Sequence, residues 1–98
     1  MFGLRIVRVA GASMAPALHD GDYLVARRYG RRVPAIGDLA VVRHRQYGLM
    51  VKRVIAERQS GGFDLAGDGT ASTPAVDLRS IPLSCFEARV LCRLPIGR

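Results

Sequence analysis

Short runs of alternating polar and apolar residues, each closed by a glycine-containing turn, most constrain the fold of this chain. Alternation with a period of two residues is typical of strands with one buried face. The predicted strands cover residues 4–9, 23–28, 39–45, 49–58, 63–66 and 86–94. The one helical candidate is a turn or two around Ala15–His19. We therefore predict an all-β domain, a coiled antiparallel sheet or partly open barrel of about six short strands.

The length of the chain limits it to one core. Hydrophobic residues make up 49% of its 98 positions, so residues 1–98 are predicted to form a single domain. The longest stretch without a charge, Val9 to His19, is far shorter than the roughly 20 apolar residues of a membrane-spanning helix. We therefore expect no transmembrane segment and a soluble, cytoplasmic protein.

The two cysteines, Cys85 and Cys92, are close in sequence and seven positions apart, which is opposite parity for a strand. Side chains at opposite parity point to opposite faces of a sheet, so we expect no disulfide and predict two reduced, buried thiols. No cluster of cysteine and histidine suggests a metal site, and we expect no cofactor.

The basic residues of the chain are very unequal. The formal net charge is +7, and the 15 basic side chains are all arginine except Lys52. An arginine keeps its proton in proteins, whereas a buried lysine can become neutral and act as a base. The single lysine is therefore a candidate catalytic residue.

The pattern around Lys52 strengthens this interpretation. Strand alternation places Met50, Lys52, Val54 and Ala56 on one face, where the lysine is the lone charge. Burial of an ammonium group is costly, so such a lysine tends to lose its proton and can then activate a neighbouring hydroxyl. The alternative is a lysine that extends along an edge strand into solvent.

Two loops supply further candidates. Ser13 follows the first predicted strand between small residues, and Pro16 stiffens the turn after it. A serine in this position also fits a simple turn or helix cap. Near the other end of the chain, Asp77 and Arg79 follow the Gly67–Gly69 turn, where they form either a support for a site or a weak surface ion pair.

Taken in order, these segments resemble the motifs of type I signal peptidases and their relatives, the LexA-type self-cleaving proteases. Ser13–Pro16 resembles the Ser-Met-x-Pro nucleophile motif, and Lys52–Ile55 resembles the motif that holds the catalytic lysine. Three further segments are similar in order and spacing: Leu18–Val25, Gly37–Val42 and Gly67–Arg79. The resemblance implies the catalytic-core fold of that family and a serine endopeptidase that uses a Ser13–Lys52 dyad.

The resemblance also implies supporting positions and a substrate. The supporting positions flank the nucleophile or close the last motif: Gly11, Ala12, Met14, Pro16, Asp77 and Arg79. The substrate is expected to be a protein or peptide bound as an extended strand. Short members without a membrane anchor include the maturation proteases of nickel-type superoxide dismutase, which remove a leader from a precursor, and we take this as the most specific role to test.

The chain departs from the family pattern at Gly11 and in its last motif, which is longer than usual and has Leu78 where a second serine would fall. Gly11 stands where some relatives place a serine that helps to stabilise the oxyanion, so only backbone N–H groups remain for this task. Ala75 stands where a lysine-orienting serine would fall, and Ser72 or Thr73 would have to replace it. A catalytically inactive relative that acts as a binding module therefore stays open as an alternative.

Two other classes of protein also remain open. A Ser-His-Asp triad could use His19 or His44, although no spacing favours it. A nucleic-acid-binding β-barrel could use a basic stripe of arginines, but aromatic residues are only 6% of the chain and tryptophan is absent. Because single-strand binders stack bases on aromatic side chains, nucleic acid is not the expected partner. The stripe would comprise Arg27, Arg28, Arg31, Arg32, Arg43 and Arg45.

Overall fold

The computed structural model describes residues 3–10, 18–67 and 78–94, and it confirms the all-β prediction. Each strand begins and ends within one residue of its predicted bounds. The elements are β1 (Leu4–Arg8), β2 (Tyr23–Arg28), β3 (Leu39–His44), β4 (Gly48–Glu57), β5 (Phe63–Ala66), a short 3-10 turn η1 (Leu83–Cys85), and β6 (Phe86–Arg93). The predicted turn at Ala15–His19 falls largely outside the described residues, and the sequence did not predict η1.

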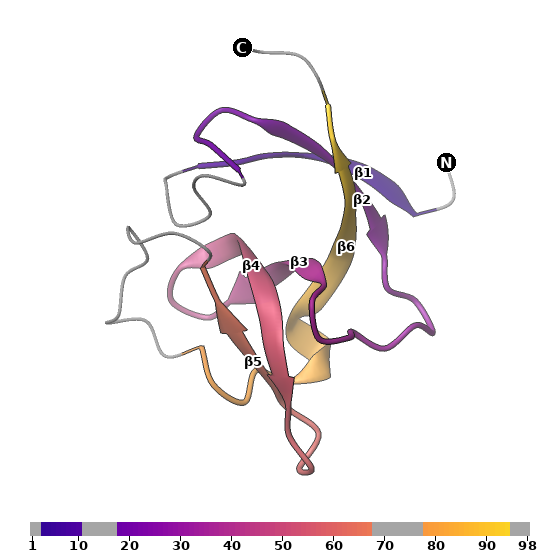
Figure 1. Cartoon of the computed structure of the whole chain (residues 1–98), viewed down its shortest axis with the longest axis vertical. Helices are drawn as coiled ribbons and strands as arrows, with labels where there is room; N and C mark the ends of the chain where they lie inside the picture. Colours follow the sequence, from indigo (N-terminus) through magenta and orange to yellow (C-terminus); the bar gives the residue numbers. More distant parts are fainter. Residues whose placement is uncertain (1–2, 11–17, 68–77, 95–98) are drawn as a thin grey trace.

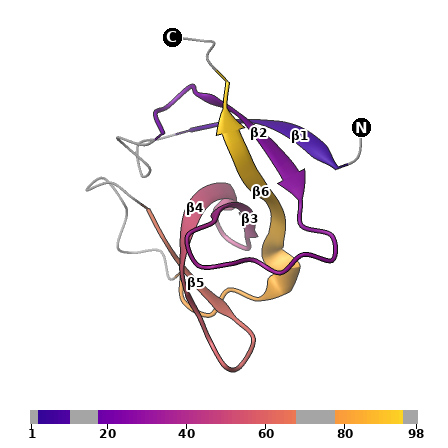
Figure 2. The same ribbon diagram turned by 45° about the vertical axis from the view of Figure 1, so that its right-hand side comes forward.

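All six strands belong to one antiparallel sheet with the order β1-β2-β6-β3-β4-β5. The sheet is not closed, so β1 and β5 are its two edge strands. Figures 1 and 2 show β1 and β2 in the upper part of the molecule and β4 and β5 in the lower part, while β6 runs from one part into the other. The element that joins the two parts therefore comes last in the chain.

The sheet coils because its pairing is interrupted at three places. The register shifts between β2 and β6, between β3 and β6, and between β4 and β5. A bulge bends the strand that carries it and increases the local twist. These bends turn the β1 side of the sheet relative to β4, so that residues of both strands line one cleft.

The hydrophobic core is unevenly divided between the two parts. Its largest cluster includes three aromatic rings, with the Phe86 ring centroid 5.2 Å from that of Phe63 and 6.0 Å from that of Tyr29. The full cluster comprises Tyr29, Ala40, Val42, Val54, Phe63, Leu65, Ile81 and Phe86. The two other clusters contain three buried residues each, Val9 with Leu18 and Leu24, and Ala26 with Val41 and Ala88.

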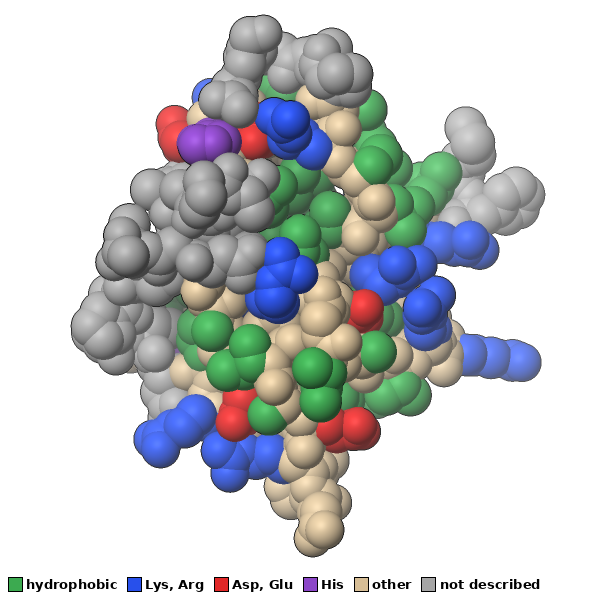
Figure 3. Space-filling view, in the orientation of Figure 1, with side chains coloured by type: hydrophobic (Ala, Val, Ile, Leu, Met, Phe, Trp, Pro, Cys, Tyr) green, Lys and Arg blue, Asp and Glu red, His purple; other side chains and the backbone are tan. Residues whose placement is uncertain are grey.

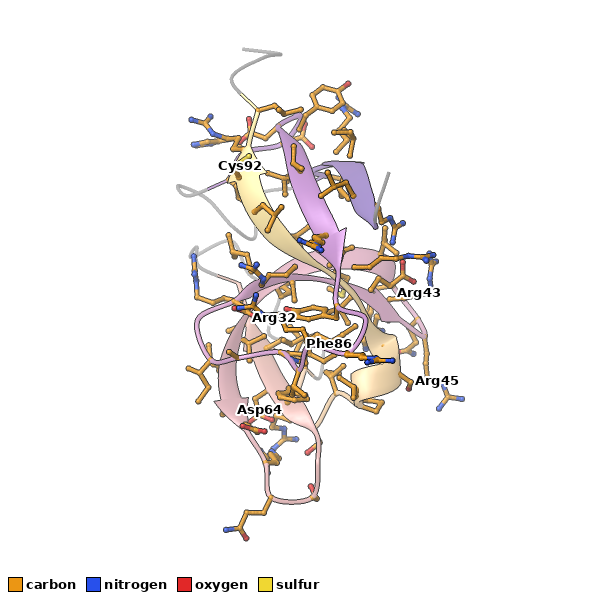
Figure 4. All side chains as sticks on the ribbon, turned by 90° about the vertical axis from the view of Figure 1, so that its right-hand side faces the viewer. Arg32, Arg43, Arg45, Asp64, Phe86 and Cys92 are labelled. Carbon is orange, nitrogen blue, oxygen red and sulfur yellow. The ribbon has the colours of Figure 1, made fainter. Side chains whose placement is uncertain are left out.

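The prediction of two buried thiols is wrong. Both cysteines are free, but Cys85 is only half-buried and Cys92 is exposed. Cys92 lies near the far end of β6 (Figure 4), beyond the last β6 residue that pairs with β3, which is Arg89. Among the described strands, only β2 pairs with this end of β6. Cys92 is therefore not enclosed by neighbouring strands as the buried Ala88 is.

Candidate active site

Lys52 lies in the middle of β4, directly opposite Ala40 of β3. Its side chain is only 6% exposed, and Val54 on the same face is 1% exposed. The structure therefore confirms the face predicted from strand alternation. It contradicts the alternative in which the lysine extends into solvent.

The surroundings of Lys52 favour its neutral form. Within the described residues, no carboxylate forms an ion pair or hydrogen bond with this amine. Burial alone lowers the pKa of Lys52 from its ordinary value of 10.5, because an apolar environment penalises the charged ammonium. A lysine with this shift is better suited to accept a proton than an exposed one.

Lys52 lines a cleft of about 310 Å³ between two walls of the coiled sheet. One wall consists of β1 and the two residues that follow it, from Val7 to Ala10. The other wall is the first half of β4, from Leu49 to Lys52, with Val41 and Tyr47 beside it. Strand alternation predicted a buried lysine here, but the cleft depends on the contact between strands far apart in the sequence.

The β1 wall carries backbone groups that pair with no other strand of the described residues. The Val9 N–H donates to the Asp22 carbonyl at 2.8 Å, and the Val9 carbonyl accepts from the Gly21 N–H at 2.8 Å. Since backbone groups of successive strand residues point to opposite sides, those of Arg8 and Ala10 face the free edge. No strand of the described residues pairs with this edge.

The β4 wall has a second free edge. The Val54 N–H donates to the Asp38 carbonyl at 2.8 Å, so alternation directs the backbone groups of Leu49 and Val51 away from β3. On that side β5 pairs with β4 only between Arg53 and Glu57. Within the described part of the chain, the first half of β4 therefore also has an unpaired edge, and both unpaired edges belong to strands that line the cleft.

Asp22, for which the sequence predicted only a turn, anchors the wall formed by β1. It is 1% exposed, its carboxylate accepts the His19 N–H at 2.9 Å, and the Arg93 guanidinium lies 3.9 Å away. A buried acid needs such partners, because an unpaired one carries a large desolvation cost. The one sequence signal for this role of Asp22 was its position in a Gly-Asp pair before an apolar strand.

Most of the other predicted site residues lie outside the described residues: Gly11, Ala12, Ser13, Met14, Pro16 and Asp77. Arg79 is described and exposed. Hydrogen bonds from Arg58 and from the Ser80 N–H hold the pKa of Asp64 below its ordinary value, and the charge of Arg79 adds to this effect. Arg79 thus acts electrostatically on β5, and its role in supporting the dyad stays a prediction.

The histidines of the alternative triad are both described. The His44 Nδ1 accepts the N–H groups of Gln46 and Tyr47 at 3.1 and 3.3 Å, which holds the turn between β3 and β4. His19 contributes its backbone N–H to Asp22. Neither contact favours a role as general base.

Among the described residues, no group of three metal-ligating side chains could hold a metal ion. No helix of the described part is both long enough and apolar enough to cross a bilayer.

Comparison with known families gives one match. The model of a family described as "Signal peptidase, peptidase S26" matches residues 1–57, which is more than half of the 98 positions. The matched range runs from β1 through the end of β4, so it includes both walls of the cleft, Ser13 and Lys52. No curated protein and no solved structure matches the chain.

Proposed function

We propose, because the chain belongs to the signal peptidase family, peptidase S26, that it is a serine endopeptidase that cuts a protein precursor with a Ser13–Lys52 dyad. The observation that carries this proposal is the burial of Lys52 beside the cleft. A surface lysine would be protonated at neutral pH and could not accept the proton of a serine.

The proposed reaction is peptide hydrolysis through an acyl-enzyme. Ser13 Oγ attacks the scissile carbonyl while the neutral Lys52 amine accepts its proton. Lys52 then protonates the leaving amine and afterwards activates the water that hydrolyses the ester. The Ser13 N–H forms part of the oxyanion hole, where one donor contributes about 2.7–4 kcal/mol.

Covalent geometry supports the pairing of these two residues. Ala10 lines the same cleft as Lys52. Ser13 follows Ala10 by three residues in the sequence, and three residues of fully extended chain span at most about 11 Å. The nucleophile is therefore tethered close to the cleft that holds its proposed base.

The two free edges support binding of the substrate as an extended strand. Within the described residues, no strand pairs with the backbone groups of Arg8 and Ala10 on one wall or of Leu49 and Val51 on the other, which supports their pairing with a peptide in the cleft. Addition of a strand to an exposed sheet edge is a common mode of peptide recognition. In this mode main-chain hydrogen bonds give affinity, and the side chains of the cleft select the residues next to the cut.

The more specific part of the proposal concerns the substrate. The motif order resembles that of the maturation proteases of nickel-type superoxide dismutase, so we propose removal of a short leader from such a precursor in the cytoplasm. This part rests on the resemblance alone. The proposed Ser13–Lys52 mechanism does not depend on which precursor is cut.

The test is cleavage of a leader-bearing precursor and of a peptide library by the wild type, Ser13→Ala and Lys52→Arg. Lys52→Arg keeps the positive charge but removes the ability to become neutral, so we expect activity to fall by about 10²–10⁴-fold. Arg45→Lys changes an exposed basic residue and is the matched control, with activity unchanged. Cleavage that survives either dyad substitution would contradict the mechanism.

The pH profile provides a second measurement. Only the neutral amine accepts a proton, so activity rises with pH through the pKa of Lys52, which burial lowers from 10.5. We expect kcat/KM to increase with pH and level off below 10.5. A profile that keeps rising to the ordinary pKa of an exposed lysine would count against Lys52 as the base.

A further inference from the structure

A second hollow, of about 310 Å³, lies apart from the cleft and shares no lining residue with it. Four arginines and one tyrosine line it: Arg27, Arg28, Tyr29, Arg32 and Arg89. They come from the end of β2, the loop that follows it, and the middle of β6. We call this hollow the arginine groove.

The charges of the arginine groove are not neutralised within the described part of the chain. Arg27 on β2 and Arg89 on β6 lie directly opposite each other, and like charges in this arrangement destabilise a sheet. None of the four arginines forms an ion pair with a carboxylate of the described residues. The next acid on β6, Glu87, instead pairs with two arginines outside the groove. An anionic ligand would relieve this repulsion.

Tyr29 gives the groove a fixed and neutral floor. It is 7% exposed, its ring packs edge-on against Phe86, and its hydroxyl donates to the Asp38 carboxylate at 3.0 Å. Burial, this hydrogen bond and the charge of Asp38 raise the pKa of Tyr29, while the charges of Arg89 and Arg32 act in the opposite direction. The ring is not available to stack against a base, which disfavours single-stranded nucleic acid as the ligand.

The distribution of basic side chains also disfavours nucleic acid. Lys and Arg side chains form separate groups on the face shown in Figure 3, with hydrophobic side chains between them. In Figure 4, Arg32 lies left of the centre of the view, whereas Arg43 and Arg45 lie at its right, and the two groups line different hollows. The predicted stripe is therefore divided, and the arginine groove is compact rather than extended.

The arginine groove is joined to the catalytic lysine by one row of paired residues across the sheet. Arg89 pairs with Ala40, and Ala40 pairs with Lys52. Two strand spacings separate the backbones of Arg89 and Lys52, which is about 10 Å. Ala40 itself is fully buried, so a polypeptide bound in the cleft reaches the groove around the sheet and not along this row.

We propose that the arginine groove binds an acidic segment, rich in glutamate or aspartate, of the protein substrate. The guanidinium group presents two parallel donors to a carboxylate, so several arginines around one hollow favour a ligand with several carboxylates. The identification of that ligand as the substrate rests on the proposed peptidase function. The expected affinity of the groove for an acidic peptide is independent of that function.

The test measures the binding of a fluorescein-labelled hexaglutamate peptide to the Ser13→Ala variant by fluorescence anisotropy. The matched probe is a labelled hexaglutamine peptide, for which we expect no binding. The double substitution Arg32→Gln with Arg89→Gln should weaken hexaglutamate binding by about tenfold or more. Arg43→Gln with Arg45→Gln removes the same formal charge outside the groove and should change hexaglutamate binding by less than about twofold.

An equal loss in the two double variants would overturn the proposal, because binding would then follow net charge rather than the groove. Tighter binding of a single-stranded oligonucleotide than of hexaglutamate, with the same dependence on Arg32 and Arg89, would also overturn it. Thermal unfolding shows whether each variant folds.

Binding is measured without cleavage, so a wild type that cuts no peptide would overturn the proposed function and leave the binding result standing. With an active wild type, the groove substitutions should raise KM for acidic substrates and leave that of neutral substrates unchanged.

Discussion

The two parts of the sheet differ in how they are held together. The part around β3, β4 and β5 packs eight buried residues, including three aromatic ones, into one cluster. The part around β1 and β2 has one cluster of three buried residues, Val9, Leu18 and Leu24, together with the buried Asp22, and a further cluster of three joins β2, β3 and β6. The first part is stabilised mainly by apolar packing, whereas the second depends more on polar contacts and on pairing between strands.

This difference matters for the proposed dyad. Lys52 belongs to the densely packed part, while β1, the strand that leads to Ser13, belongs to the other. Regions with few buried apolar contacts open at lower free energy than densely packed ones. The sheet therefore fixes the base firmly and attaches the segment that carries the nucleophile less firmly.

The largest effect expected from this comparison is that of Phe86→Ala. Phe86 contacts both other rings of the large cluster, so its truncation should lower the free energy of unfolding by about 3–5 kcal/mol. Urea denaturation provides the measurement. Leu91→Ala, on the same strand at 42% exposure, is the control and should cost less than about 0.5 kcal/mol. Similar losses in both variants would contradict a core centred on Phe86.

Substitution of Asp22 tests the polar anchor of the other part. Asp22→Ala removes the acceptor for the His19 N–H and should cost about 1–3 kcal/mol in urea denaturation. Hydrogen exchange should also show faster opening of β1 than of β4. Asp22→Asn keeps an acceptor oxygen and should cost less than Asp22→Ala. If β1 and β4 lose protection equally, the two parts unfold as one unit and the comparison fails.

The pH dependence of stability tests the burial of Lys52. Its pKa is lower in the folded chain than the 10.5 of the unfolded chain, so between these two values the unfolded chain binds more protons. The free energy of unfolding should therefore rise as pH increases through this window and stop rising near 10.5. Lys52→Met should lack this rise and be more stable than the wild type at neutral pH. Parallel curves for the two proteins would show that the lysine is not desolvated.

The smallest effect is expected for Glu87→Gln, which weakens a link between the two parts. Glu87 accepts from Arg5 of β1 and from Arg43 of β3, both at 2.7 Å, but it is partly exposed. These hydrogen bonds lower the pKa of Glu87 below its ordinary 4.5, so their contribution is lost as pH falls through that lowered value. We expect a cost of about 0–1 kcal/mol at neutral pH, less in high salt. A cost that is independent of salt would indicate lost packing instead.

Much of the fold was predictable because its signals are local. Glycine turns and alternation over a few residues identify each strand, and the same alternation identifies the buried face of Lys52. The exposed Cys92 was not predictable, because its environment depends on how far β3 runs along β6. The roles of Val7–Ala10 and Tyr47 as cleft residues were missed for the same kind of reason, since strand alternation carries no information on which strands approach each other.

The sequence by itself determined an all-β chain with one lysine on an apolar strand face, in motifs that place it in the signal peptidase family. Only the tertiary structure decided that β1 and the first half of β4 form the walls of one cleft, and that Arg27 and Arg89 meet in an arginine groove. The physical reason is that strand formation follows from local periodicity, whereas strand order and the bends at bulges follow from pairings between distant segments.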